Sequence, residues 1–204
     1  DLWDLVENWE MKNFNYELGP VSGQVPHFIS IPDSKFDIED GMAFVQIWSW
    51  YQKEYGQIVE DTVMIGKPLN IAQLGNELSI FIDDSIASGQ IQFSNNHIDS
   101  RLRFSTKSYD GAMYLSYQNP EKGYSILEFA RPKIMAIDTI QVTTDEESKL
   151  KIYYKFYGRN KKEIQRGHTS FKYSTIPTTL DLYPAYPNPF NPITTLQFDI
   201  PYLE

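Results

Sequence analysis

The spacing of apolar residues divides this chain into two parts. Up to Gly56, apolar residues recur at three- and four-residue intervals in two stretches, Leu2, Leu5, Val6, Trp9 and Met42, Val45, Trp48. This spacing places the apolar side chains on one side of a helix. The first part therefore predicts two amphipathic helices, the second widened by Phe44 and Ile47.

The two helical stretches form an internal repeat. A shift of 39 residues pairs the following positions: Asp1 with Asp40, Val6 with Val45, Trp9 with Trp48, and Tyr16 with Tyr55. Turn-forming residues fill positions 19–26 between the two copies. Residues 1–56 are thus predicted to be a small helical module, with Asp1-Leu2-Trp3 interpreted as the middle of a helix in a longer protein.

After Gly56 the apolar residues alternate with polar ones. The runs that alternate are 78–82, 113–117, 140–142 and 150–157, and turn-forming clusters separate them. Alternation indicates strands with one face buried, and short strands at this spacing are typical of sandwiches. We predict a mainly β fold: an antiparallel β-sandwich of jelly-roll or Ig-like type over residues 57–180, carrying the helical module at its N-terminal side.

Residues 181–204 have a different character. Four prolines, at positions 184, 187, 189 and 192, fix the backbone and remove amide donors. The segment is predicted to be a stiff, extended linker followed by one strand.

Charge and composition exclude several partners. The chain has 27 acidic and 18 basic residues, a net charge of -9, no cysteine and no apolar run of membrane-spanning length. An acidic protein is a poor ligand for nucleic acid or an anionic membrane. We expect no nucleic-acid partner and no membrane insertion, whereas calcium, a protein or a glycan remain open.

No catalytic constellation emerges from the sequence. The three histidines, His27, His97 and His168, fall on separate predicted loops, and no nucleophile elbow or phosphate-binding glycine loop accompanies them. The loop aspartates fit turns, where their side chains bond the local backbone. We therefore expect a protein that is not an enzyme.

The helical repeat, with Phe36-Asp37-Ile38-Glu39-Asp40 before its second helix, resembles a dockerin. The resemblance implies two calcium loops, each ended by an aspartate that opens a helix, and docking onto a cohesin. A loop of about twelve residues that ended at Asp40 would offer Ile29, Ile31, Asp33, Asp37 and Asp40 at its ligand positions. We expect at most weak calcium binding, by Asp33, Asp37 and Asp40; alternatively, Asp37 or Asp40 caps a helix.

The β-region resembles a cohesin or a carbohydrate-binding module. The residues that carry this resemblance are Gly89-Gln90-Ile91-Gln92-Phe93-Ser94 and Tyr124-Ser125-Ile126-Leu127-Glu128-Phe129. The segment Tyr186-Pro187-Asn188-Pro189-Phe190-Asn191-Pro192 resembles the opening of the sorting domain used by type IX secretion, of which residues 181–204 would hold the first strand. That resemblance implies an extracellular or cell-surface protein, with attachment through the full-length protein.

Two sets of aromatic residues are candidates for binding. The first set, Trp48, Trp50 and Tyr51, lies on the second helical stretch and is a candidate for contact with a protein partner or with the sandwich itself. Tyr153 and Tyr157 are expected to be exposed or half-exposed on the lysine-bearing face of their strand, and Tyr114, on the face opposite Met113 and Leu115, is a third candidate. Such rings bind sugars or stabilise cross-strand pairs. We predict a non-catalytic interaction or scaffolding module, dockerin–cohesin-like or packed internally; the alternative is a carbohydrate-binding module.

Overall fold

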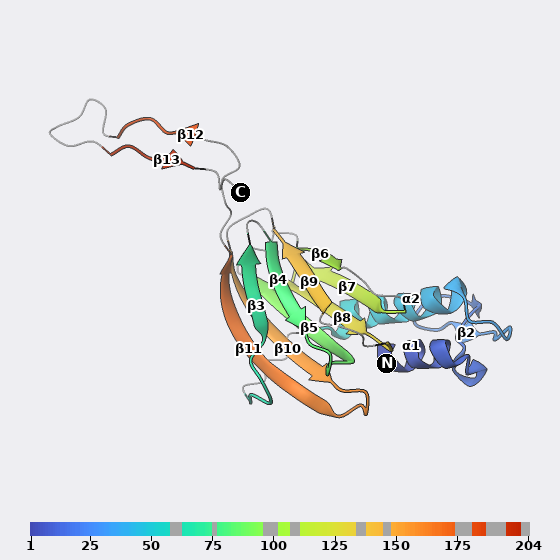
Figure 1. The fold of residues 1–204 in the computed structure, drawn as a ribbon. Helices are drawn as coiled ribbons and strands as arrows, with labels where there is room; N and C mark the ends of the chain where they lie inside the picture. Colours follow the sequence, from blue (N-terminus) through green and yellow to red (C-terminus); the bar gives the residue numbers. More distant parts are fainter. Residues whose placement is uncertain are drawn as a thin grey trace.

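The structure is a computed structural model. It describes residues 1–57, 63–74, 77–95, 102–106, 111–133, 138–144, 148–173, 181–186 and 195–200. Figure 1 shows a helical layer at one side of two packed sheets, and a separate hairpin near the C-terminus.

Both predicted helices are present. The helix α1 (Leu2–Met11) begins after Asp1, and α2 (Ile38–Tyr55) begins after Asp37. Each start is a capping box, in which an aspartate at the third helical position, Asp4 or Asp40, bonds the backbone of the capping residue. The expectation that Asp40 opens the second helix was wrong, because Asp37 is the residue with extended backbone and an accepting side chain. Asp1, interpreted from the sequence as mid-helix, is the N-cap of α1 in the structure, and its side chain accepts from the amide of Asp4.

A long connection, residues 12–37, joins the two helices. It contains the 3-10 turn η1 (Phe14–Tyr16) and the two-stranded pair β1 (Val21–Ser22) and β2 (Ile29–Ser30). At Gly19 the backbone lies against α2, and a Cβ there would come within 2.5 Å of the Glu39 carbonyl carbon. Only glycine fits this close approach.

The predicted sandwich is confirmed. One sheet has the order β11-β10-β5-β8-β7 and the other β3-β4-β9-β6, and neighbouring strands pair antiparallel. The strands are β3 (Asn70–Leu74), β4 (Glu77–Ile82), β5 (Ser88–Asn95), β6 (Arg103–Thr106), β7 (Met113–Asn119), β8 (Tyr124–Ala130), β9 (Asp138–Thr143), β10 (Ser148–Tyr157) and β11 (Glu163–Tyr173).

Alternating residues fill the space between the sheets. Those with no exposed surface include Leu78, Ile80, Ile82, Ile91, Phe93, Phe129, Ile140, Leu150, Ile152 and Phe156. They come from both sheets, as the two-residue period requires. The burial of such side chains stabilises each by roughly 1.5–3 kcal/mol relative to exposure.

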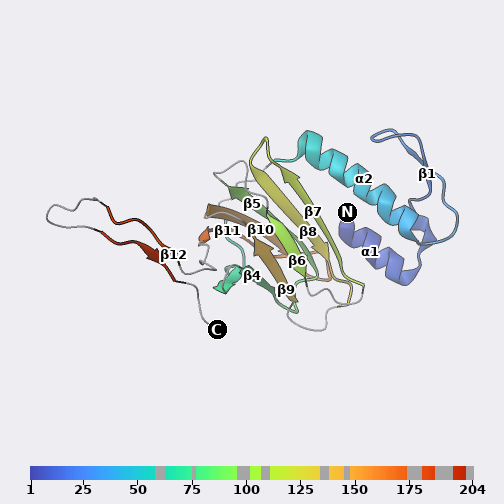
Figure 2. The same cartoon turned by 90° about the horizontal axis from the view of Figure 1, so that it is seen from above.

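The strand β8 is covered on both faces. Leu127 and Phe129 belong to the core between the sheets, whereas Ile126 and Ala130 pack against the helical layer. From α1, Trp3 and its neighbours contact Ala130, and from α2, Trp48 contacts Ile126. Figure 2 shows both helices beside β7 and β8, so they cover one half of the outer face of the five-stranded sheet.

The C-terminal segment forms a small hairpin. The strands β12 (Asp181–Leu182) and β13 (Phe198–Asp199) pair antiparallel, and Tyr186 bridges Thr195. Positions 187–192 of the proline-rich motif lie outside the described residues. Among the helices that the structure describes, none is long and apolar enough to cross a membrane.

Candidate functional site

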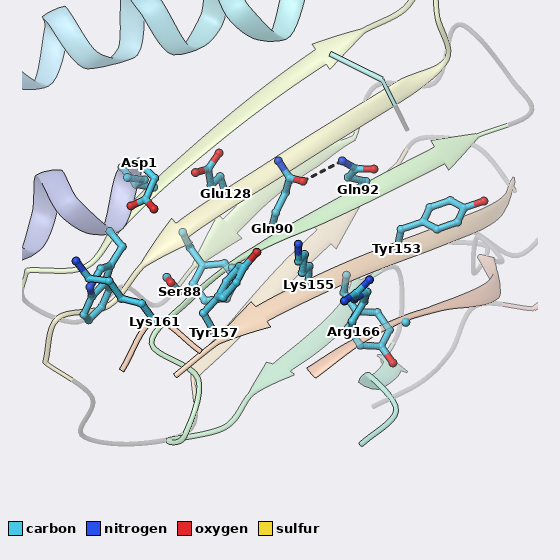
Figure 3. Close-up of a pocket in the computed structure, with 16 residues that line it drawn as sticks. Asp1, Ser88, Gln90, Gln92, Glu128, Tyr153, Lys155, Tyr157, Lys161 and Arg166 are labelled. Atoms are coloured by element: carbon cyan, nitrogen blue, oxygen red, sulfur yellow. Dashed lines mark hydrogen bonds between the residues drawn. The ribbon is translucent and has the colours of Figure 1, made fainter. Parts of the chain in front are cut away.

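A groove of about 420 Å³ lies on the outer face of the five-stranded sheet, beside the helical layer. Its floor is formed by β5, β10 and β11, and the first turn of α1 forms one wall (Figure 3). The residues that line the groove come from segments far apart in the sequence, from Asp1 to Gly167. The fold therefore assembles this surface from segments that are distant in the chain.

The strand register arranges the floor in rows. Three rows cross β11, β10 and β5 in that order: His168, Tyr153, Gln92; Arg166, Lys155, Gln90; and Glu163, Tyr157, Ser88. Residues directly opposite in neighbouring strands lie on the same face of a sheet. Aromatic rings thus flank a row of cationic and amide side chains.

Two glutamines and a glutamate form the polar side of the groove. The Nε2 of Gln92 donates to the Oε1 of Gln90 at 2.9 Å. Glu128, opposite Gln90 on β8, accepts a hydrogen bond of 2.7 Å from the Nε1 of Trp48 on α2. Burial raises the pKa of the Glu128 carboxyl above its ordinary value, and the hydrogen bond from Trp48 opposes that rise. Glu128 therefore joins the groove to the helical layer.

The cations of the floor share one carboxylate. Glu163 lies 3.4 Å from the Nζ of Lys155 and 2.7 Å from the guanidinium of Arg166. The Lys155 ammonium also lies 5.5 Å from the centre of the Tyr157 ring, which is within the range of a cation–π contact. These contacts fix the Lys155 head group above the floor.

A lysine from the β10–β11 turn fastens the helical wall. The Nζ of Lys161 lies 2.6 Å from Asp4 and 3.2 Å from Glu7, both on α1. The hydrogen bond with Lys161 lowers the pKa of Asp4 below its ordinary value. Because Lys161 also lines the groove, these ion pairs link the helical wall to the turn that borders the floor.

The structure brings two of the three predicted sugar-binding tyrosines together. Tyr153 and Tyr157 both line the groove. The prediction of an exposed or half-exposed position holds for Tyr157, which is half-buried, but is wrong for Tyr153, which is 9% exposed. Its ring packs 6.0 Å from that of His168, and this neighbour on β11 accounts for part of the burial.

Tyr114 is not part of this surface. Its ring stacks on Phe129 in the core between the sheets, and its hydroxyl donates to the buried carboxylate of Asp138. Its expected position on an exposed face was wrong. Met113 and Leu115, on the opposite face of β7, pack against the helices, so the outer face of β7 is apolar as well.

The three predicted partner-binding residues lie in different environments. Trp48 is buried against Tyr124 and Ile126 of the sandwich, as the internal-packing alternative expected. Trp50 is half-buried and meets Tyr55 edge to face at 5.5 Å. Tyr51 is 54% exposed and also contacts Tyr55 at 5.5 Å. An exposed aromatic cluster of Trp50, Tyr51 and Tyr55 therefore marks the end of α2.

The aspartates proposed as calcium ligands accept backbone hydrogen bonds. The Oδ1 of Asp40 accepts from the amides of Leu18 and Gly19, at 2.7 and 2.9 Å, and its Oδ2 accepts from Asp37 at 2.9 Å. Asp37 caps α2, and the exposed Asp33 pairs with Lys35 at 2.7 Å. Within the described ranges, no group of three or more histidine, aspartate or glutamate side chains could hold a metal ion. Calcium binding stays a prediction.

Sequence reasoning missed most of the groove. Gln90 and Gln92 alternate with the buried Ile91 and Phe93, so their shared face could have been inferred from the pattern. Glu128 lies in the strand Tyr124–Ala130, where nearly every residue is buried, and this hides the alternation. Its position could not be assigned from sequence.

Comparisons with known proteins show a distant resemblance only. No family model and no curated protein matches the chain. Among solved structures, the chain is similar to a cohesin module from a family 33 glycoside hydrolase of Clostridium perfringens ATCC13124. That similarity has a TM-score of 0.38 and 12% sequence identity, and it covers 55% of this chain and 98% of that one.

Glu128 is expected to make stability depend on pH. Its pKa is raised in the folded state, so folding favours the protonated form. Its stabilising contribution is therefore full below the ordinary value of about 4.5 and is lost as pH rises through the raised folded value. In urea unfolding at a series of pH values, wild type should lose stability relative to Glu128→Gln across that interval.

The exposed Glu121 supplies the control for this measurement. A Glu121→Gln variant should keep the same pH dependence as wild type. If Glu128→Gln and wild type differ by a constant amount at every pH, the Glu128 carboxyl is not responsible.

Proposed function

We propose that this chain is a non-catalytic binding module whose ligand site is the groove between α1 and the strands β5, β10 and β11. The observation that carries the proposal is the composition of its floor, where Tyr153 and Tyr157 flank Lys155 and the amide pair of Gln90 and Gln92. The helical layer would then act as a fixed wall, since its inner side packs on the sandwich.

The ligand that fits this floor best is a carbohydrate. A peptide that adds a strand needs an open sheet edge, and a helix in a groove needs an apolar floor. This groove offers the face of a sheet instead, with glutamine, glutamate, lysine and arginine side chains that can bond hydroxyl groups. Tyrosine rings add a flat apolar surface with a polar end.

The spacing of the rings suits an extended chain of sugars. Tyr153 and Tyr157 are four residues apart on β10, and at about 3.3 Å per residue this separates them by roughly 13 Å. Lys155 lies midway on the same face. A ligand that reached both rings would have to be an oligosaccharide rather than a single sugar.

The carboxyl groups of the lining support a binding role rather than hydrolysis. Glycoside hydrolysis uses two carboxyl groups that face each other across the scissile bond. Among the described residues of the groove and its floor, the carboxyl groups belong to Asp1, Glu128 and Glu163. Asp1 caps α1, Glu128 accepts from Trp48, and Glu163 pairs with Lys155 and Arg166. All three have structural partners.

We place the protein outside the cell, on the sequence resemblance of residues 186–192 to the start of a type IX sorting domain. A module with a glycan groove would there hold a larger secreted or surface protein on polysaccharide.

Replacement of Tyr157 by alanine is expected to weaken binding of the cognate polysaccharide about tenfold, the equivalent of the ~1.5 kcal/mol that an aromatic contact contributes. Affinity electrophoresis in gels with soluble polysaccharides, and pull-down on insoluble ones, measure it. Tyr186→Ala, at an 80% exposed ring of the C-terminal hairpin, is the matched control. Binding by wild type and Tyr157→Ala with equal strength would exclude the groove as the site.

A second candidate function is binding of a protein partner by the aromatic cluster of α2. The observation that favours it is the exposure of Tyr51 and Tyr55, 54% and 60%, beside the half-buried Trp50. Tyrosine and tryptophan are enriched among residues that dominate protein interfaces. One variant distinguishes the two functions. Tyr51→Ala should leave glycan binding unchanged and should weaken only binding to a protein partner.

A further inference from the structure

The groove lining holds more cations than carboxyl groups, although the protein is acidic. The chain has a net charge of -9, whereas Lys155, Lys161 and Arg166 line the groove beside the carboxyl groups of Asp1 and Glu128. Lys161 is engaged with two carboxylates of α1. The pair that faces the middle of the floor is therefore Lys155 with Arg166.

These two cations are directly opposite each other on neighbouring strands. Like charges in such positions repel and destabilise a sheet unless an anion lies between them. Glu163 supplies one anion for both cations. The side chain of Lys155 is 46% exposed and that of Arg166 is 25% exposed, so both can still be reached from the groove.

The surroundings of this pair suit a sugar that carries an acid group. Tyr153 and Tyr157 precede and follow Lys155 on the same face of β10, and Gln90 lies opposite it on β5 (Figure 3). A sugar ring over the half-buried Tyr157 would bring a substituent to the Lys155 ammonium and the other hydroxyl groups to Gln90. The planar guanidinium of Arg166 matches the two oxygens of a carboxylate.

We propose that the groove recognises a polysaccharide built from carboxylated sugars, of the uronic acid class, through Lys155 and Arg166. This inference rests on the proposed function and adds the ligand's charge to it. The carboxylate would be a second anion between the two cations, opposite Glu163. Gln90, Gln92 and Glu128 would bind hydroxyl groups along the same chain.

The test compares charged polysaccharides with their uncharged forms. Affinity electrophoresis and isothermal titration use polygalacturonate and alginate, each beside its carboxyl-reduced counterpart, and a sulfated polysaccharide as a further arm. We expect at least one carboxylated form to bind about tenfold or more tightly than its reduced form, a difference of ~1.4 kcal/mol. Binding should weaken as salt is raised.

Variants separate the specific site from general attraction. Lys155→Gln is expected to remove the preference for the carboxylated form. Lys151→Gln is the matched control, since Lys151 lies on the same strand and face but not in the groove. Thermal melting establishes that each variant is folded.

Each remaining outcome has a definite meaning. Equal binding of charged and reduced forms, or an equal effect of Lys151→Gln and Lys155→Gln, overturns the inference and leaves a glycan-binding groove. Preference for the sulfated form overturns the assignment of a carboxylate. Binding of no polysaccharide by folded wild type overturns the proposed function as well.

Discussion

Replacement of Asp40 by alanine is expected to be among the most destabilising single changes in the molecule, lowering the free energy of unfolding by about 3–6 kcal/mol. The carboxylate is 1% exposed and accepts the amides of Leu18, Gly19 and Asp37. A buried donor left without an acceptor costs roughly 1–3 kcal/mol. The amide of Gly19 is buried, whereas those of Leu18 and Asp37 are partly buried and cost less. Urea denaturation followed by far-ultraviolet circular dichroism measures the loss.

Asparagine at position 40 gives a graded control. Its amide oxygen can replace the Oδ1 that accepts from Leu18 and Gly19, but its amide nitrogen cannot accept from Asp37. Asp40→Asn should therefore lose only about a third as much stability as Asp40→Ala.

The melting temperature of wild type should be the same in calcium and in chelator. A rise with calcium that Asp40→Ala abolishes would identify Asp40 as a ligand instead.

Replacement of Trp48 by alanine is expected to lower the free energy of unfolding by about 3–5 kcal/mol, the usual loss for a buried aromatic side chain. Trp48 is 7% exposed, packs on Tyr124 and Ile126, and meets the Tyr117 ring edge to face at 6.4 Å. Its removal also takes the hydrogen-bond donor from the carboxyl of Glu128. Chemical denaturation gives the magnitude, and near-ultraviolet circular dichroism reports the packing.

Two further variants divide that effect into its parts. Trp48→Phe keeps a ring but removes the donor to Glu128, so about 1–3 kcal/mol should be lost. Trp50→Ala, two residues along the same helix, removes a half-buried ring whose described aromatic contact is with Tyr55 of α2, and should cost less than Trp48→Ala. If the two alanine variants lose equal stability, the helical layer does not depend on the contact with β8.

The alternation of apolar and polar residues predicted the sandwich because the strands β4 and β10 bury one face in the core between the sheets. Leu78, Ile80 and Ile82 are buried, and the two residues between them are half-buried, which is the alternation seen in the sequence. The inward set of β10, from Leu150 to Phe156, follows the same rule. In such strands a one-residue error would turn every side chain to the wrong face.

The same rule failed where the outer face is covered. On β7 it separated Tyr114 from Met113 and Leu115, but it assigned the tyrosine to solvent. The helices cover the outer face of β7, so that face carries the apolar Met113 and Leu115. Tyr114 therefore lies on the inner face, where its hydroxyl donates to Asp138. Alternation defines two faces and cannot state which one a second layer will cover.

The predicted start of the second helix lies three residues after the observed one, because both Asp37 and Asp40 fit the sequence pattern of a helix start. Asp37 and Asp40 are the two partners of one capping box, and the repeat aligned the wrong one with Asp1.

The groove could not be predicted from the sequence for a different reason. Its floor depends on the pairing of β5 with β10, whose register joins Gln90 to a lysine 65 positions later, at Lys155; sequence periodicity contains no information on such pairing.

The ion pairs of Lys161 with α1 also bear on how the protein can be divided. Residue 56 ends the helical module in sequence, and a fragment that began at residue 63 would look like a complete sandwich. Yet that fragment would lack Asp4 and Glu7 as partners for Lys161, and would expose Ile126 and Ala130 to water. Such an apolar surface favours association. Removal of residues 1–62 should therefore yield a fragment that aggregates and whose groove lacks the wall formed by α1. The helices and the sandwich are best produced together.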